Sequence, residues 1–226
     1  MSEEEGAPHE QGTAATTVGV LRGLLDKQRK TVAGERCDIC ATPIPDEHAH
    51  VVNVESRNLL CACRACYLLF TSEGAAQGRF RAVPDRHLYA PSFAFGEAQW
   101  DALQIPVRIA FFFFNSTLGR VVAFYPSPAG ATESLLSLEA WRELEQANPL
   151  LGSLAPDVEA LLVYGRRDRE GFDCFIVPID TCYELTGVVR LRWKGFDGGE
   201  EAWREIEGFF DRLRARSRES PDESAR

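Results

Sequence analysis

Cys37-Asp38-Ile39-Cys40 is followed, after twenty residues, by Cys61-Ala62-Cys63-Arg64-Ala65-Cys66. Two Cys-x-x-Cys pairs at this separation bring four thiolates to one point, which is the ligand set that a tetrahedral metal ion needs. Within each pair, the backbone amides of the turn also point at the sulfurs and stabilise their charge. The sequence therefore predicts a metal site with four ligands: Cys37, Cys40, Cys63 and Cys66.

The spacing of the cysteines does not by itself identify the metal. Four thiolates leave a zinc ion no open position for water, so a zinc ion here is expected to be structural, with one Zn²⁺ per chain and no colour. The same ligand set suits a rubredoxin-like iron or an iron–sulfur cluster, which stays open as the alternative. A helix that begins at Cys63 is expected to lower the pKa values of Cys63 and Cys66.

The residues around the cysteines predict a small module over residues 35–78. His50–Val54 reads as a strand, 55–58 as a turn and Leu59–Cys61 as the returning strand. A helical stretch, 64–70, carries the last cysteine. If each Cys-x-x-Cys turn is called a hook, the order is hook, hairpin, hook and helix. This order is that of a treble-clef finger, and a zinc ribbon is the alternative.

Three further polar side chains in this module are candidate ligands. Cys61 lies two residues before Cys63, so it can replace a ligand or accompany a cluster, but packing as a small hydrophobe is the favoured interpretation. His48 and His50 resemble the metal-binding residues of His-Asn-His nucleases, yet Tyr67 stands where those enzymes place a histidine. We expect both histidines to face solvent in a turn.

The remaining sequence predicts one α+β domain with antiparallel strands over residues 79–218, and a core separate from that of the module. Residues 107–114 and 120–125 form one expected hairpin, and 158–164 with 172–178 a second. Helices are expected around 138–148 and 203–213, whereas 188–193 fits a helix or a strand. Residues 1–34 are expected to be mostly disordered with a short helix near 18–30, and 219–226 a disordered tail.

Other candidate sites in this domain are weaker. Cys182 follows Asp180, an expected helix cap, and this position can activate a thiol; burial of Cys182 and Cys174 in the core is favoured. The stretch 126–134 is rich in Pro, Gly and hydroxyl residues and can cradle an anion, but an ordinary strand-to-helix loop is favoured because the Gly-Lys-Ser/Thr ending of a phosphate loop is missing.

Charge and hydropathy exclude several classes of protein. The net charge of −9 argues against binding to nucleic acid. The longest apolar run, 109–114, is too short for membrane insertion, and the first residues are acidic without a secretory signal. We therefore expect a cytoplasmic protein, where clustered cysteines bind metal rather than form disulfides.

Several segments together resemble a known family: 37–40, 59–66, 83–86, 121–135, 177–183 and 192–195. The chain is similar to an uncharacterised actinobacterial zinc-finger-containing protein family often encoded beside nickel–iron hydrogenase genes. The resemblance implies an accessory role in hydrogenase assembly or function, with a hydrogenase subunit or maturation factor as the protein partner. The expected function is thus that of a non-enzymatic zinc-binding accessory protein; an iron or iron–sulfur protein for electron transfer or cluster delivery is the alternative.

Overall fold

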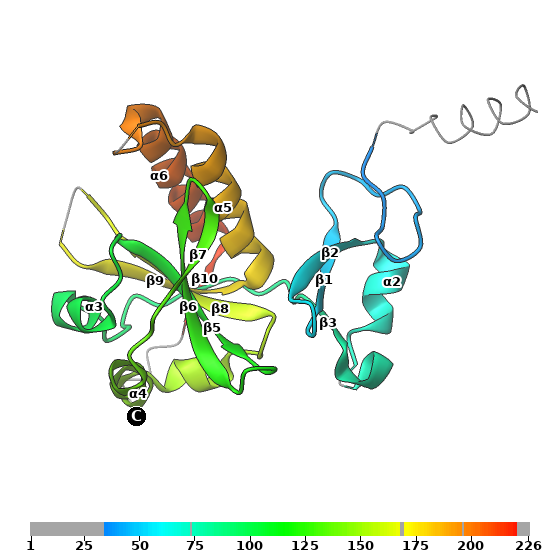
Figure 1. Ribbon diagram of the computed structural model, residues 1–226, viewed down its shortest axis with the longest axis horizontal. Helices are drawn as coiled ribbons and strands as arrows, with labels where there is room; N and C mark the ends of the chain where they lie inside the picture. Colours follow the sequence, from blue (N-terminus) through cyan, green and yellow to red (C-terminus); the bar gives the residue numbers. More distant parts are fainter. Residues whose placement is uncertain (1–33, 73, 168–169, 196, 221–226) are drawn as a thin grey trace, which may run out of the picture. The chain divides into compact units, whose positions relative to one another are not determined.

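The four cysteines lie in a small module built around a three-stranded antiparallel sheet. The structure is a computed structural model that describes residues 34–72, 74–167, 170–195 and 197–220; the helix expected near residues 18–30 lies outside them (Figure 1). The strands β1 (Ala49–Asn53), β2 (Asn58–Ala62) and β3 (Phe80–Ala82) have the order β2-β1-β3. The helix α2 (Arg64–Leu69) follows β2 directly. The predicted treble-clef-like order is therefore present.

The small sheet has one strand that the sequence did not predict. A short 3₁₀ helix, η1 (Ala75–Gly78), turns the chain, and β3 then pairs with β1 through Val51–Ala82, Val52–Arg81 and Asn53–Phe80. The strand that follows residue 78 thus belongs to the sheet of the four-cysteine module. Three residues are too short a run to give a strand pattern in the sequence.

The larger domain is built on a seven-stranded sheet of order β10-β4-β9-β8-β5-β6-β7. All neighbouring strands are antiparallel except β10 and β4, which are parallel. The domain is therefore α+β with mainly antiparallel strands, as predicted. The strands are β4 (Leu88–Tyr89), β5 (Ile109–Asn115), β6 (Arg120–Ser127), β7 (Gly130–Ser134), β8 (Glu159–Gly165), β9 (Phe172–Pro178) and β10 (Arg218–Glu219).

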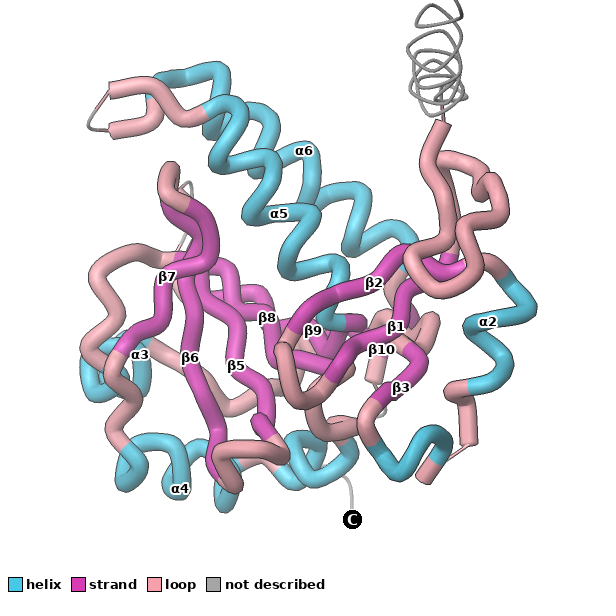
Figure 2. The backbone as a smooth tube through the Cα atoms, turned by 45° about the vertical axis from the view of Figure 1, so that its right-hand side comes forward, coloured by secondary structure: helices cyan, strands magenta, loops and turns pink. Residues whose placement is uncertain are grey.

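Helices cover both faces of this sheet (Figures 1 and 2). The helices α5 (Ile179–Arg192) and α6 (Gly199–Arg216) pack on one face, against Phe111 of β5 and Phe175 of β9. The helices α3 (Glu97–Leu103) and α4 (Leu138–Ala147), with the 3₁₀ helix η2 (Pro149–Ser153), pack on the other face against Phe112. The central strand β5 is therefore apolar on both sides.

Two segments of the larger domain differ from their sequence interpretation. The segment 126–134 is not a strand-to-helix loop but a hairpin, in which β6 and β7 pair up to Ser127–Gly130. The segment therefore forms the edge of the seven-stranded sheet rather than a connecting loop. Arg218, the last residue of the expected domain, and Glu219, the first of the expected tail, form β10 beside β4. The amide of Ser220 donates to the carbonyl of Tyr89 over 2.8 Å. The ambiguous stretch 188–193 continues the helix α5 as far as Arg192.

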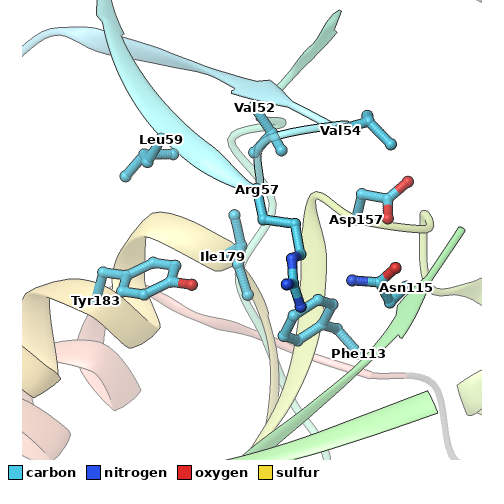
Figure 3. A pocket seen from close by; sticks show the side chains of 9 residues that line it. All are labelled: Val52, Val54, Arg57, Leu59, Phe113, Asn115, Asp157, Ile179 and Tyr183. Atoms are coloured by element: carbon cyan, nitrogen blue, oxygen red, sulfur yellow. The ribbon is translucent and has the colours of Figure 1, made fainter. Parts of the chain in front are cut away.

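The expectation that the four-cysteine module has a separate core is wrong. Val52 of β1 and Val54 of the turn after it are buried in the same cluster as residues of β5, β8, β9, α5 and α6. Figure 3 shows the hairpin side chains facing Phe113 and Ile179 across a cavity of about 30 Å³, with the side chain of Arg57 reaching into it. Successive side chains of a strand point to opposite faces, so one face of β1 packs on the cysteines and the other packs on the larger domain. The module and the larger domain therefore share a core.

Candidate metal centre

The first cysteine pair lies in a tight turn closed by a bridge between Arg36 and Pro43. The amide of Cys37 donates to the carbonyl of Thr42 over 2.9 Å, and the amide of Ala41 donates back to the carbonyl of Cys37 over 2.8 Å. Ala41 has a φ of 60°, the left-handed conformation that usually favours glycine. The turn places both sulfurs of the pair on one side.

The second pair is placed by the start of a helix. Cys63 is the residue before α2, with φ −69° and ψ 160°, and Cys66 is buried within the first turn. The amide of Tyr67 donates to the carbonyl of Cys63 over 2.9 Å, and the hydroxyl of Tyr67 donates to the carbonyl of Val83 over 3.1 Å. These bonds fix the helix, and with it the second pair, against the chain that leaves the module.

Asp38 joins the first pair to the hairpin. Its amide donates to the carbonyl of Cys61 over 2.9 Å, and its Oδ2 accepts from the amide of Cys61 over 2.7 Å. The hook is thereby held to β2 at two points, two residues before Cys63. Hydrogen bonds made by both the backbone and the side chain of Asp38 thus help to bring the two Cys-x-x-Cys pairs together.

The four sulfurs predicted as ligands lie together. The Sγ atoms of Cys37, Cys40, Cys63 and Cys66 are all within 4.8 Å of one another. The sulfurs of Cys40 and Cys63 are 3.6 Å apart. A tetrahedral ion with metal–sulfur bonds of about 2.3 Å requires sulfur separations of about 3.8 Å, so this group has the dimensions of a four-thiolate metal site.

The surroundings of the sulfurs favour thiolates on the first pair. The hydroxyl and amide of Thr42 lower the pKa of Cys40 to about 6. Burial alone would raise the pKa of Cys37, but hydrogen bonds from the amides of Cys63, Cys40 and Ile39 outweigh it, and this pKa is lowered. Backbone and hydroxyl donors therefore supply part of the compensation that a thiolate needs.

The prediction that a helix start lowers the pKa of Cys66 is wrong for the protein without an ion. Burial, followed by hydrogen bonding to the neighbouring cysteines, raises the pKa of Cys66 to about 12. The six-residue helix α2 is too short to outweigh these effects. A cation bound by these four residues would supply the missing positive charge and reverse the preference, because metal-bound thiols are deprotonated.

The remaining cysteines are distributed differently. Cys174 and Cys182 are buried in the larger domain, and burial raises the pKa of each thiol, so the packing interpretation is confirmed and the activated-thiol one is not. Asp180 lies in the first turn of α5 rather than at its cap. Cys61 pairs with His50 across the β1–β2 ladder. All seven cysteines are described by the structure, and none of them forms a disulfide.

The prediction that both histidines face solvent in a turn is wrong. His48 and His50 are half-buried, and the Nδ1 atom of His50 lies 2.9 Å from Oδ2 of Asp180. Asp180 is the residue that sequence reasoning missed here. It is 130 positions away in the chain, so no local pattern links it to the module.

Comparison with known proteins assigns the chain to a family. The model of a family of unknown function, DUF5947, matches residues 36–217, and the chain belongs to this family. The matched region includes both the cysteine group and the larger domain. No curated protein and no solved structure matches the chain. Among the described helices, none combines the length and apolarity needed to cross a membrane.

Proposed function

We propose that this protein is a non-enzymatic, zinc-binding accessory protein that works through protein–protein contacts. The observation that carries the proposal is the geometry of the four sulfurs, which offers a tetrahedral ion all its ligands. An ion coordinated in this way has no position for substrate or water, and its contribution is to folding. Function then lies in the surfaces that the ion holds in place.

Exposed apolar side chains on the four-cysteine module support a partner surface. Leu68 and Leu69 on α2 are 50% and 65% exposed, and Ile39 in the first hook is also exposed. Exposed apolar side chains offer contacts to a protein partner where they gather in one patch. The expected partner is a hydrogenase subunit or maturation factor, on the basis of the family resemblance.

Co-purification from native cells tests this proposal. We expect tagged protein, isolated without oxygen, to retain a hydrogenase component, and the double variant Leu68→Asp/Leu69→Asp to lose it. Leu191→Asp is the matched control, because Leu191 is 81% exposed but lies on α5. Normal hydrogen uptake in a deletion strain, with no hydrogenase component retained, would refute the accessory role.

An iron centre is the second candidate. Cys40 is exposed, which gives a bound iron a short path for electrons to a partner at the surface. Four thiolates bind iron as readily as zinc in their geometry. Visible absorption separates the two, because iron–thiolate centres are coloured and zinc centres are not.

A further inference from the structure

A second group of metal-ligand side chains lies beside the four-cysteine group. His50 of β1 faces Cys61 of β2 in the ladder, so these two side chains share one face of the small sheet. His48 lies just before β1, and its ring centroid is 4.8 Å from that of His50. One ring nitrogen of each histidine and Sγ of Cys61 lie within 4.8 Å of one another. All three residues are half-buried.

The hydrogen bonds of the two rings orient their lone pairs. Nδ1 of His48 is 2.9 Å from the carbonyl of Pro45 and 3.1 Å from that of Asp46. Carbonyl oxygens only accept, so this nitrogen carries the proton and the Nε2 atom, which is buried, carries the lone pair. His50 directs its own Nδ1 to a carboxylate in the same way. In this tautomer, Nε2 is the ring nitrogen of each histidine that can bind a metal.

Asp180 lies where a carboxylate can support a histidine ligand without binding the ion itself. Its Oδ2 is 2.9 Å from Nδ1 of His50, and its Oδ1 accepts from the amide of Thr181 over 2.7 Å. A carboxylate on the far nitrogen of a histidine fixes the ring and raises its basicity, which is the usual support of histidine ligands in metal sites. This aspartate comes from the larger domain, so the arrangement is complete only in the folded chain.

The histidines also open onto a large groove. His48 and His50 line a space of about 980 Å³ whose polar lining includes Asp85, Asp180 and Arg216. Three protein ligands leave a tetrahedral ion one position for water or for an incoming group. This distinguishes the group from the four-thiolate centre, in which every position is taken.

We propose that His48, His50 and Cys61 form a second metal site, with Asp180 as its positioning residue. Two imidazoles and one thiolate suit a borderline-soft divalent ion, and zinc is the ion that both ligand types favour. With three protein ligands, a tetrahedral ion here keeps one position for water or an incoming group. The chain therefore binds two ions of different character: one with four protein ligands and a structural role, and one with an open position.

Cobalt binding to the full-length protein tests this site. The protein is used as isolated, with its first metal retained, and is titrated with Co²⁺ without oxygen. We expect one further ion per chain, with a thiolate-to-cobalt charge-transfer band. Cys61→Ser removes the band, and His50→Ala weakens binding by roughly 100-fold or more, since the loss of an outer-sphere partner alone costs 10–100-fold. In both variants the first metal remains.

Two more variants separate a metal site from a polar contact. Asp180→Asn keeps the charge-transfer band but weakens the second ion by about 10- to 100-fold. His87→Ala is the matched control, because His87 lines the same groove without belonging to the group, and it leaves binding unchanged. A wild-type chain that takes up no second ion, or a second ion that persists in Cys61→Ser and His50→Ala, overturns the proposal. Loss of both ions in both variants overturns it too, by assigning Cys61 to the first centre.

Discussion

Replacing Cys37 by Ser is expected to destabilise the larger domain, although the residue lies in the four-cysteine module. Cys37 is a buried member of the four-sulfur group. Metal binding in small thiolate modules contributes roughly 10–16 kcal/mol of folding free energy. Without a complete ligand set, an ion would no longer join the turn of Cys37 and Cys40 to the start of α2, and the β1–β2 hairpin between them would no longer pack in a fixed position.

The magnitude follows from the side chains that the module places in the shared core. Val52, Val54 and Val83 are buried against the larger domain. Full burial of a valine stabilises by about 1.5–3 kcal/mol, so three contribute about 5–9 kcal/mol as an upper estimate. The total stability of a domain is about 5–15 kcal/mol. We therefore expect a loss of about 5 kcal/mol in the larger domain.

Tryptophan fluorescence measures this effect selectively, because all four tryptophans lie in the larger domain: Trp100, Trp141, Trp193 and Trp203. With a urea slope of about 1–3 kcal/mol/M, the midpoint of unfolding falls by about 2 M or more in Cys37→Ser. Ile39→Ser is the control, since it changes an exposed residue of the same hook and keeps all four thiols. An unchanged midpoint in Cys37→Ser would show that the larger domain folds independently.

Three further outcomes are expected. Arg86→Met should lower the free energy of urea unfolding by about 3–5 kcal/mol, because it leaves the carboxylate of Glu159 buried without its charged partner. That carboxylate is 3% exposed and accepts two hydrogen bonds of 2.7 and 2.6 Å from Arg86. Removing the exposed ion pair of Arg108 in the same way should cost at most about 1 kcal/mol, and equal costs would contradict the role of burial. Cys61→Ser should keep the metal of the four-thiolate centre and Cys63→Ser should lose it, as read by elemental analysis; the reverse result would reassign the ligands. The protein should give no shift of duplex DNA in a gel at micromolar concentration and physiological salt, given its charge of −9, and a salt-dependent shift would contradict this.

Features set by short-range pattern were predictable from the sequence. The spacing of the cysteine pairs predicts the four-sulfur group, because a turn of four residues and a hairpin of fixed length leave the sulfurs little choice of position. The run Ile109–Asn115 predicts a central strand because apolar side chains are needed on both faces. The apolar stripe Ile206, Phe210 and Leu213 likewise predicts the buried face of α6.

Features set by contacts between distant segments were not predictable. The bond between His50 and Asp180 depends on where the four-cysteine module rests on α5. The strands β3 and β10 are two or three residues long and exist because β1 and β4 offer free edges. The sequence did not predict the hairpin β6–β7 because proline is rare within strands. Pro126 is tolerated because it lies beyond the part of β6 that pairs with β5, so β5 requires no amide from it.

The most direct test of the account is the metal content of the protein purified without oxygen, measured together with its visible spectrum. The four-thiolate centre predicts at least one zinc per chain that survives dialysis, in a colourless protein, and that is lost in Cys37→Ser. Stoichiometric iron with thiolate charge-transfer absorption would contradict the zinc assignment and favour the electron-transfer alternative. A chain that is folded without any bound metal would contradict the metal centre itself.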